Sequence, residues 1–436
     1  MYGWQLLSVT LPTSLFVLGC IAFAFLAAFL LSGIFGPTPR YAITNREQLP
    51  PNGTPEFLNL LESLADAKVN HTGQVEILKN GPAFYPVELD AIRNARHSVN
   101  LEAYIFQDSE IGRQYLEALA ERARAGVEVN VVLDAFGSAS ATRTFFEPLL
   151  SAGGKVSWYN SPAWYNLTRL GHRTHRELLI VDGRIGFIGG AGVADQWYRG
   201  VHDHPHWRDT MVRVEGEAVT NLQATFAENW LAACGELLAG EAYFPDIDCP
   251  HRTQLMVVNS TPTAGGSTRA RVLFQLLIAS AQRSISITTP YFLPDKSLIE
   301  ELCRAIVDRH VKVRVLVPGR KSDHMLTRST SRGGYGPLLK AGAEVYEYQP
   351  SMIHAKVLCV DSLWAVVGST NFDNRSFGIN DEVNLAVCDS DVAQRLETDM
   401  ADDIRQSCRV SLEEWKHRPI FERAPEVLGW IFERQQ

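Results

Sequence analysis

Two side chains suited to phosphate chemistry stand two positions apart in the sequence His354-Ala355-Lys356. On an extended strand, side chains at i and i+2 point to the same face, so an imidazole and an ammonium lie together. An imidazole can attack phosphorus or move a proton, and an ammonium can hold a non-bridging oxygen. Ser369 and Asn371, on the strand expected next, add neutral hydrogen-bond donors. This combination suits attack on a phosphodiester.

A second copy of the pattern begins at His175 but departs from it at the lysine position, where Glu177 stands. Gly190 fits the glycine-rich step that follows, whereas Gly192 takes the place that Asn371 has in the other copy. A carboxylate facing a phosphate is repulsive, strongly so in dry surroundings. The first copy therefore needs an explanation that the second does not.

Three interpretations of Glu177 are open. Arg173 precedes His175 by two residues, so on a continuing strand it shares a face with Glu177 and could neutralise it or supply the missing cation. Alternatively, Lys356 alone carries the phosphate and Glu177 serves an acceptor hydroxyl. In the third interpretation the site is impaired.

The elements that must position the two histidines also occur twice. In each half a strand-like segment ends in YIFQD or YFLPD, and the two strings lie 187 residues apart. An alternating apolar strand, a similar glycine turn and the histidine string follow in each half, at offsets of 184, 189 and 179 residues. Landmarks in one order at a nearly constant offset indicate a duplicated unit. Helices alternating with short Val- and Ile-rich strands predict the α/β class, with a mainly parallel sheet in each half, flanked by helices and related by a pseudo-twofold axis.

The drop in the last offset places an insertion of about ten residues before His175 in the first half, among aromatic residues that could form a lipid-facing rim or part of the core. These aromatic residues are Trp158, Tyr159, Trp164 and Tyr165. We divide the chain into a membrane anchor (1–37), a linker and lead-in (38–80), a first half (81–245), a second half (246–410) and a C-terminal helical tail (411–436).

The start of the chain carries no charged side chain before Arg40. Residues 14–35 form an apolar run of 22 residues, enough for a transmembrane helix. A cleaved signal peptide would place Lys or Arg in its first residues, and none is there, so we expect a retained anchor. Because Arg40 and Arg46 follow the run, the positive-inside bias places the rest of the chain in the cytoplasm.

Charge and cysteine usage narrow the partners. The net charge of −8 disfavours a protein that coats nucleic acid, although a local basic patch is compatible with it. The seven cysteines form no CxxC pair, which indicates neither a zinc cluster nor a disulfide framework. His202, His204 and His206 alternate beside Asp203, and we interpret them as a polar loop at the mouth of the site rather than a zinc site. We therefore expect neither metal nor cofactor.

The second string resembles the motif of the phospholipase D superfamily, H-x-K-x4-D followed by G-S-x-N. The match extends over GSTNFDNRSFGINDE at 368–382, and TPYFLPD at 289–295 and residues 322–348 resemble the cardiolipin synthase branch. The resemblance covers about residues 70 to 436. Asp182 and Asp361 complete the two motifs, and we expect each to have a structural role, capping the turn that follows its strand.

The resemblance implies that the halves bring both histidines to one phosphate without a metal. It makes His175 the nucleophile and His354 the general acid and base, although the symmetry of the halves allows the reverse. In the family an acidic residue downstream in each half orients the histidines, and the matching positions are Asp209 and Glu382.

The sequence thus predicts a membrane-bound phosphatidyltransferase that makes cardiolipin. The phosphatidyl group of one phosphatidylglycerol would pass through a phosphohistidine to an acceptor lipid alcohol. Its partners would be phospholipids and the membrane, and not nucleic acid. The alternatives are hydrolysis of the same bond, a nuclease of the superfamily, and an impaired membrane scaffold in which Glu177 marks a lost activity.

Overall fold

The structure is a computed structural model that describes residues 16–25, 40–161, 171–200, 205–262, 268–323 and 325–418. Trp164, Tyr165 and the histidines at 202 and 204 lie outside these ranges, as do most of the predicted membrane span and the end of the tail. Residues 16–25 form a helix with exposed side chains. Within the described ranges, no helix combines the length and the apolar run needed to cross a membrane.

The first half is built on a seven-stranded sheet with the order β2-β8-β7-β6-β3-β4-β5. Its strands are β2 (Gly73–Lys79), β3 (Ser98–Ala103), β4 (Glu128–Asp134), β5 (Lys155–Tyr159), β6 (Leu178–Val181), β7 (Ile185–Gly189) and β8 (Thr210–Gly216).

The second half repeats this order within a nine-stranded sheet, β1-β9-β17-β15-β14-β10-β12-β13-β18. Its strands are β1 (Val69–Asn70), β9 (Gln254–Ser260), β10 (Ser284–Thr288), β12 (Lys312–Pro318), β13 (Glu344–Tyr348), β14 (Val357–Val360), β15 (Trp364–Gly368), β17 (Glu382–Cys388) and β18 (Ser407–Val410). Without the outermost strands β1 and β18, the order β9-β17-β15-β14-β10-β12-β13 matches β2-β8-β7-β6-β3-β4-β5 strand for strand. This match confirms the duplication. A separate small sheet pairs β11 (Phe292–Leu293) with β16 (Phe372–Asp373).

The prediction that the two sheets are mainly parallel is wrong, because both are mixed. Only β3, β4 and β5 run parallel in the first sheet, and only β10, β12 and β13 in the second. The strand after each histidine instead turns back at once: β6 pairs antiparallel with β7, and β14 with β15. Each hairpin loop has three residues, 182–184 and 361–363, and the first two of each loop have positive φ, which lets the chain reverse in so short a turn.

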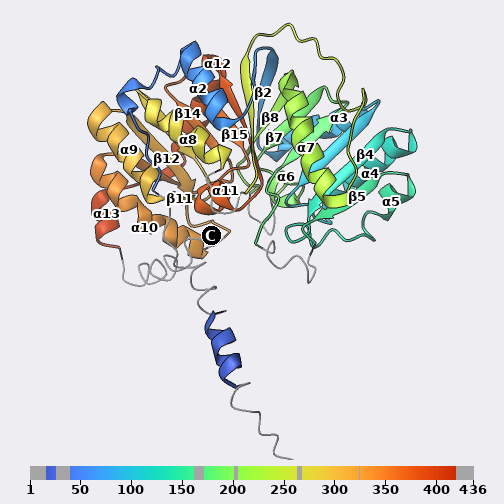
Figure 1. Cartoon of the computed structure of the whole chain (residues 1–436), viewed down its shortest axis with the longest axis horizontal. Helices are drawn as coiled ribbons and strands as arrows, with labels where there is room; N and C mark the ends of the chain where they lie inside the picture. The colour runs from blue at the N-terminus through green and yellow to red at the C-terminus, as the bar shows by residue number, and fades with distance from the viewer. Residues whose placement is uncertain are drawn as a thin grey trace, which may run out of the picture.

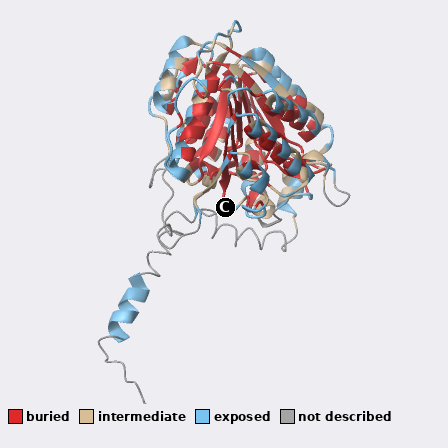
Figure 2. Ribbon diagram, turned by 90° about the vertical axis from the view of Figure 1, so that its right-hand side faces the viewer, coloured by how far each residue is buried: buried red, intermediate tan, exposed pale blue. Residues whose placement is uncertain are grey.

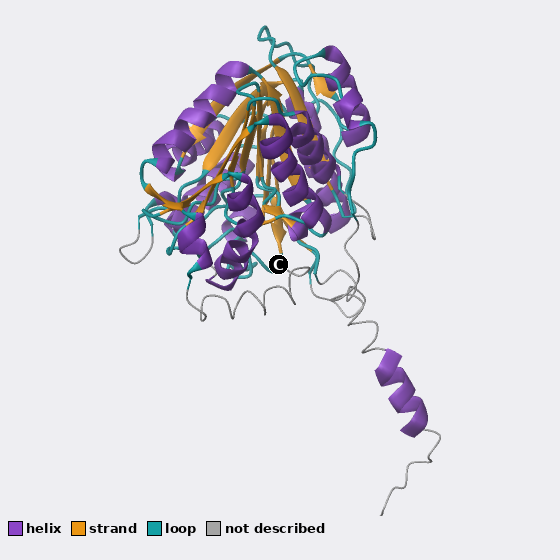
Figure 3. Cartoon of the chain, turned by 90° about the vertical axis from the view of Figure 1, so that its left-hand side faces the viewer, coloured by secondary structure: helices purple, strands orange, loops and turns teal. Residues whose placement is uncertain are grey.

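Helices cover the outer face of each sheet, and Figures 1 and 3 show the strands enclosed between them. The first half is covered by α3 (Gly81–Arg93), α4 (Glu110–Arg124), α5 (Glu147–Ser151) and α6 (Asp195–Tyr198). The second is covered by α8 (Arg269–Ser280), α9 (Lys296–Arg309) and α10 (Met325–Ala341), with α11 (Asn374–Gly378) and α13 (Leu412–Lys416) beside them. Trp415 of α13 donates a hydrogen bond to the Arg332 carbonyl of α10, so the described part of the tail docks on the domain.

The inner faces of the two sheets pack on each other, together with α7 (Ala218–Cys234) and α12 (Ser390–Ile404). Side chains of both halves, such as Ile188 and Val214 of the first and Val367 and Leu385 of the second, share one apolar cluster. Figure 2 shows these buried strands at the centre of the molecule. Because burial of each such side chain contributes about 1.5–3 kcal/mol, this cluster holds the halves in one arrangement.

Much of the segment that the sequence assigned to a linker and lead-in takes part in both halves. A short helix η1 (Arg46–Gln48) is followed by α2 (Pro55–Ala65), whose Phe57 and Leu61 are buried in the core of the second half. Strand β1 then joins the second sheet beside β9, and β2 joins the first beside β8.

Candidate active site

The segment that carries each histidine is held by the opposite half. The amide of His175 donates to the Asp381 carbonyl at 2.9 Å, and the Asp381 amide donates to Arg173 at 2.9 Å. In the same way, His354 donates to the Arg208 carbonyl at 2.7 Å. These exchanged backbone bonds place both histidines at the junction of the halves, where both line one pocket.

The imidazole of His175 is paired with Glu382 of the second half. Nδ1 lies 3.0 and 3.1 Å from the two carboxylate oxygens. Because a carboxylate only accepts hydrogen bonds, it fixes a proton on Nδ1 and leaves Nε2 for the pocket. Glu382 is fully buried and also accepts a hydrogen bond from Ser369 Oγ. Ser369 thus lies behind the carboxylate and acts on the site through it.

His354 has the corresponding partner in the first half. Its Nδ1 lies 3.0 Å from Asp209 Oδ2, which also accepts a hydrogen bond from Trp197 Nε1 at 2.9 Å. The rings of Trp197 and Trp207 flank the imidazole at centroid distances of 5.4 and 5.5 Å. The expected acids therefore do lie beside the histidines, and each pairing crosses from one half to the other.

Lys356 places a cation beside His354. Its Nζ is 2.7 Å from Nδ1 and 3.0 Å from Nε2 of that ring, and both side chains are buried. Burial, together with the Lys356 charge, lowers the pKa of His354, although Asp209 opposes this shift. Burial also lowers the pKa of Lys356, although the neighbouring carboxyl groups, that of Asp209 first, oppose this shift. Burial alone would raise the pKa of Asp209, but its hydrogen bond to His354 and the nearby cations hold it below the ordinary value.

Glu177 is buried and faces the backbone of its own half. One carboxyl oxygen accepts hydrogen bonds from the amides of Tyr104 at 3.2 Å and Ile105 at 3.4 Å. Burial raises the pKa of Glu177 well above its ordinary value, although these backbone bonds and the Lys356 charge oppose the shift. Burial therefore favours the neutral form of this carboxyl more than it does in an exposed glutamate, which weakens the repulsion expected towards a phosphate.

The two glycines of the first copy make room for this arrangement. A Cβ at Gly190 would lie 2.7 Å from Lys356 Cδ and 2.9 Å from its Nζ, so the lysine stem of the second half occupies that space. A Cβ at Gly192 would lie 2.4 Å from the Ile105 carbonyl and 3.1 Å from a Glu177 oxygen. Glu177, Gly190 and Gly192 are thus a packed set adapted to one lysine.

Arg173 does not pair with Glu177, so the interpretation in which it neutralises that carboxylate is wrong. Its Nη1 donates to the His172 carbonyl at 2.8 Å, and its guanidinium lies 4.7 Å from the centre of the Phe136 ring. Arg173 nevertheless lines the pocket, where it remains available to a ligand.

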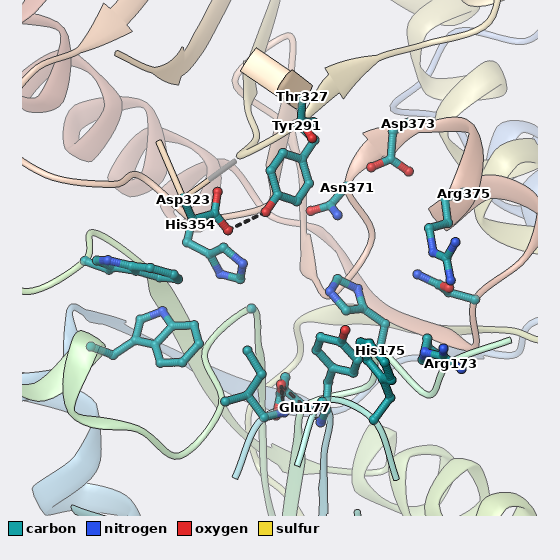
Figure 4. Close-up of a pocket in the computed structure, with 18 residues that line it drawn as sticks. Arg173, His175, Glu177, Tyr291, Asp323, Thr327, His354, Asn371, Asp373 and Arg375 are labelled. Carbon is teal, nitrogen blue, oxygen red and sulfur yellow. Dashed lines mark hydrogen bonds between the residues drawn. The ribbon is translucent and has the colours of Figure 1, made fainter. Parts of the chain in front are cut away.

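The pocket has a volume of about 560 Å³ and is lined from both halves. Figure 4 shows His175 and His354 turned into it, with Glu177 below them and Asn371 above His175. The sequence did not single out several of its lining residues: Tyr104, Phe136, Trp197, Trp207, Tyr291, Asp323, Asp373 and Arg375. A signal existed for Tyr104 and Tyr291, since they begin the repeated YIFQD and YFLPD strings. Trp158, by contrast, lies half-buried against the apolar core of the first half, and Tyr159 against the cluster shared by both halves; neither lines this pocket.

Asp182 and Asp361 lie at the hairpin turns, outside the pocket. Asp182 accepts backbone hydrogen bonds from three consecutive residues, Arg96 to Ser98. Asp361 likewise accepts from residues 282–284 and from the Asn52 side chain. Both carboxylates tie the turn to the start of the neighbouring strand.

The fold and the paired histidines define a phospholipase D-like protein of two halves. A phosphatidylserine synthase from Haemophilus influenzae Rd KW20 has the same fold, with a TM-score of 0.66 and 14% identity over 87% of this chain and 99% of that one. The model of the family described as cardiolipin synthase, PLD-like domain, matches residues 89–230 and 275–404.

Curated relatives are similar over most of both chains. Cardiolipin synthase 1 of Bacillus anthracis is 34% identical over 358 residues, which are 80% of this chain and 70% of that protein. The major cardiolipin synthase of Bacillus subtilis is also 34% identical, over 81% of this chain and 74% of its own length. The chain belongs to the cardiolipin synthase family within the phospholipase D superfamily, which confirms the prediction from the motif.

Proposed function

We propose that the protein is a phosphatidyltransferase that converts two phosphatidylglycerol molecules into cardiolipin and glycerol. The observation that carries the proposal is the pair of histidines in one pocket, each oriented by a carboxylate of the opposite half, in a chain of the cardiolipin synthase family. Lys356 supplies the cation for a non-bridging phosphate oxygen, and a neutral Glu177 leaves that role unopposed.

The electrostatics of the pocket favour His354 as the nucleophile, the reverse of the assignment that resemblance suggests. A nucleophilic imidazole must be neutral, and burial together with the neighbouring Lys356 lowers the pKa of His354. The other imidazole of the pocket, His175, then serves as the general acid, and Glu382, with both oxygens within 3.1 Å of Nδ1, orients its ring.

The reaction then has two balanced steps. His354 Nε2 attacks the phosphorus of one phosphatidylglycerol, the bond from phosphorus to the glycerol oxygen breaks, and His175 gives that oxygen its proton. A hydroxyl of the second phosphatidylglycerol then loses its proton to His175 and attacks the phosphorus. The phosphorus–nitrogen bond breaks, which releases cardiolipin and restores both histidines.

The protein acts at a membrane in this proposal. The support is the uncharged stretch before Arg40, whose apolar run at 14–35 is long enough to span a bilayer and would keep the pocket near its lipid. The arginines that follow the run favour a cytoplasmic catalytic part.

The decisive experiment incubates membranes that carry this chain with phosphatidylglycerol labelled in the glycerol and acyl groups. Cardiolipin with released glycerol supports transfer, phosphatidic acid indicates hydrolysis, and no product indicates a scaffold. His175→Ala and His354→Ala should each abolish cardiolipin formation, and full activity in either variant contradicts the two-histidine mechanism.

A phosphatidyl ester of p-nitrophenol separates the roles, because this leaving group needs no general acid. His175→Ala should still release p-nitrophenol and accumulate a phosphohistidine at His354, whereas His354→Ala should not. A phosphohistidine at His175 would restore the opposite assignment.

A further inference from the structure

Two arginines line the pocket at the end where His175 lies. In Figure 4, Arg173 and Arg375 lie beyond His175, on the side away from His354. One comes from the segment before the first histidine and the other from the start of α11, so each half contributes one cation.

Both guanidiniums are fixed by the same short segment. Arg173 donates to the His172 carbonyl at 2.8 Å, and Arg375 donates to the Gly171 carbonyl. For Arg173 this bond uses one of five N–H donors, and the flat group lies against Phe136. A guanidinium held in this way is oriented before any ligand arrives.

The two cations are close enough to affect each other. Burial, and then the charge of Arg173, lower the pKa of Arg375. The charges of Asp373 and Asp134 oppose this shift in Arg375, and both carboxylates also accept hydrogen bonds from backbone amides. Asp134 accepts from residues 136, 137 and 174, and Asp373 caps α11 through the Ser376 amide. Burial raises the pKa of Asp373 to about 6, so it offsets the cations only in part at acidic pH.

We propose that Arg173 and Arg375 form a second anion site, which binds the phosphodiester of the acceptor phospholipid. The proposal rests on the proposed function. In an acceptor phosphatidylglycerol, the attacking hydroxyl is separated from its own phosphate by one glycerol unit. A hydroxyl that gives its proton to His175 therefore carries a phosphate on the His175 side of the pocket, where the two arginines stand. Paired guanidiniums suit the oxygens of a phosphodiester.

This site would make the enzyme select a phospholipid over water or a simple alcohol as acceptor. The reacting phosphate would be held by Lys356 between the histidines, and the second phosphate by the arginines. Loss of the arginines should then impair the second step with a lipid acceptor and spare the transfer to an alcohol that has no phosphate.

The test measures two products of the full chain in neutral-detergent micelles that contain phosphatidylglycerol and ethanol. Cardiolipin reports transfer to the lipid acceptor, and phosphatidylethanol reports transfer to a neutral one. Arg173→Gln and Arg375→Gln should each lower cardiolipin formation about ten- to a hundredfold, the effect of losing charged hydrogen bonds, and leave phosphatidylethanol formation nearly unchanged. Lysine variants should recover part of the cardiolipin, and Arg405→Gln, at an exposed ion pair with Asp402, is the matched control.

Both products form in the same micelles, so weaker attraction of the variants to the anionic phosphatidylglycerol surface would lower cardiolipin and phosphatidylethanol together and could not produce a selective loss of cardiolipin. A parallel fall of both products would overturn the proposal, because the arginines would then act on the reacting phosphate or on folding. Unchanged cardiolipin formation would overturn it as well. If the unsubstituted chain makes no cardiolipin, the proposed function fails first, and that outcome is distinct from both.

Discussion

Glu177 is the residue at which this chain departs from the motif of its family, and burial changes what the departure does. As an ionised carboxylate it would repel the substrate phosphate. As a neutral acid that accepts two backbone hydrogen bonds, it becomes part of the pocket wall, and Lys356 remains the cation of the motif at the junction. The interpretation of an impaired site loses its physical basis if the carboxyl is protonated at neutral pH.

Replacing Glu177 by glutamine tests that state directly. Glutamine imitates a protonated carboxyl in shape, so cardiolipin formation near neutral pH should change only a few-fold. A carboxyl whose pKa is higher in the folded than in the unfolded state stabilises the folded protein while it is protonated. This contribution is complete below the unfolded-state pKa of about 4.3, and it is lost as the pH rises towards and through the folded-state pKa. The Glu177→Gln variant has no such loss, so its melting temperature should rise relative to the parent between pH 4 and pH 8.

The matched control is Glu413→Gln, since the Glu413 side chain is 74% exposed. Its melting temperature should follow the parent at every pH. A difference between Glu177→Gln and the parent that stays constant with pH would show that Glu177 is ionised in the folded protein.

At the scale of elements, the hairpin after each histidine explains both the success and the failure of the sequence analysis. The spacing of Asp182 and Asp361 predicted capped turns, because the carboxylate and the positive φ are local properties. The mixed direction of the sheets was missed because alternating apolar residues look the same in a parallel and an antiparallel strand. Glu382 and Asp209 could be named as partners from the family motif. That each acid pairs with the histidine of the opposite half could not be predicted, because it depends on how the halves dock.

Gly190 shows how one hairpin serves the other half, and its substitution is a test. A Cβ there would meet the Cδ and Nζ of Lys356, the flexible end of that side chain. Gly190→Ala should therefore cost little stability but displace the ammonium from His354. We expect cardiolipin formation to fall about ten- to a hundredfold, the effect of misplacing a catalytic group, with an unchanged melting temperature. Gly334→Ala in α10, where a new Cβ meets no atom within 4 Å, should leave cardiolipin formation unchanged and raise the melting temperature slightly, because alanine favours a helix over glycine. Full activity of Gly190→Ala would mean that the lysine position is not critical.

At the scale of the molecule, duplication has produced one site rather than two. The same strand order occurs in each half, yet neither half contains both a histidine and the carboxylate that orients it. Asp209 of the first half orients His354, and Glu382 of the second half orients His175. The junction is thus both the apolar core shared by the sheets and the place of the chemistry. The asymmetric set of one lysine, one buried glutamate and two glycines can then assign different roles to two similar histidines.

Because each acid pairs with the histidine of the opposite half, substitution of one acid should affect one particular histidine. Side-chain ¹⁵N spectra of the histidines, with the two signals assigned by their loss in His175→Gln and His354→Gln, report tautomer and protonation separately. Asp209→Asn should change the tautomer balance of His354 and lower its pKa further, because the Asp209 charge and hydrogen bond now raise it. Glu382→Gln should instead alter the signals of His175, whose Nδ1 loses its carboxylate. Each substitution should slow cardiolipin formation about ten- to a hundredfold, as loss of an orienting partner does. A response of His175 to Asp209→Asn with His354 unchanged would mean that each half orients its own histidine, and the shared site would then have to be rebuilt from two independent ones.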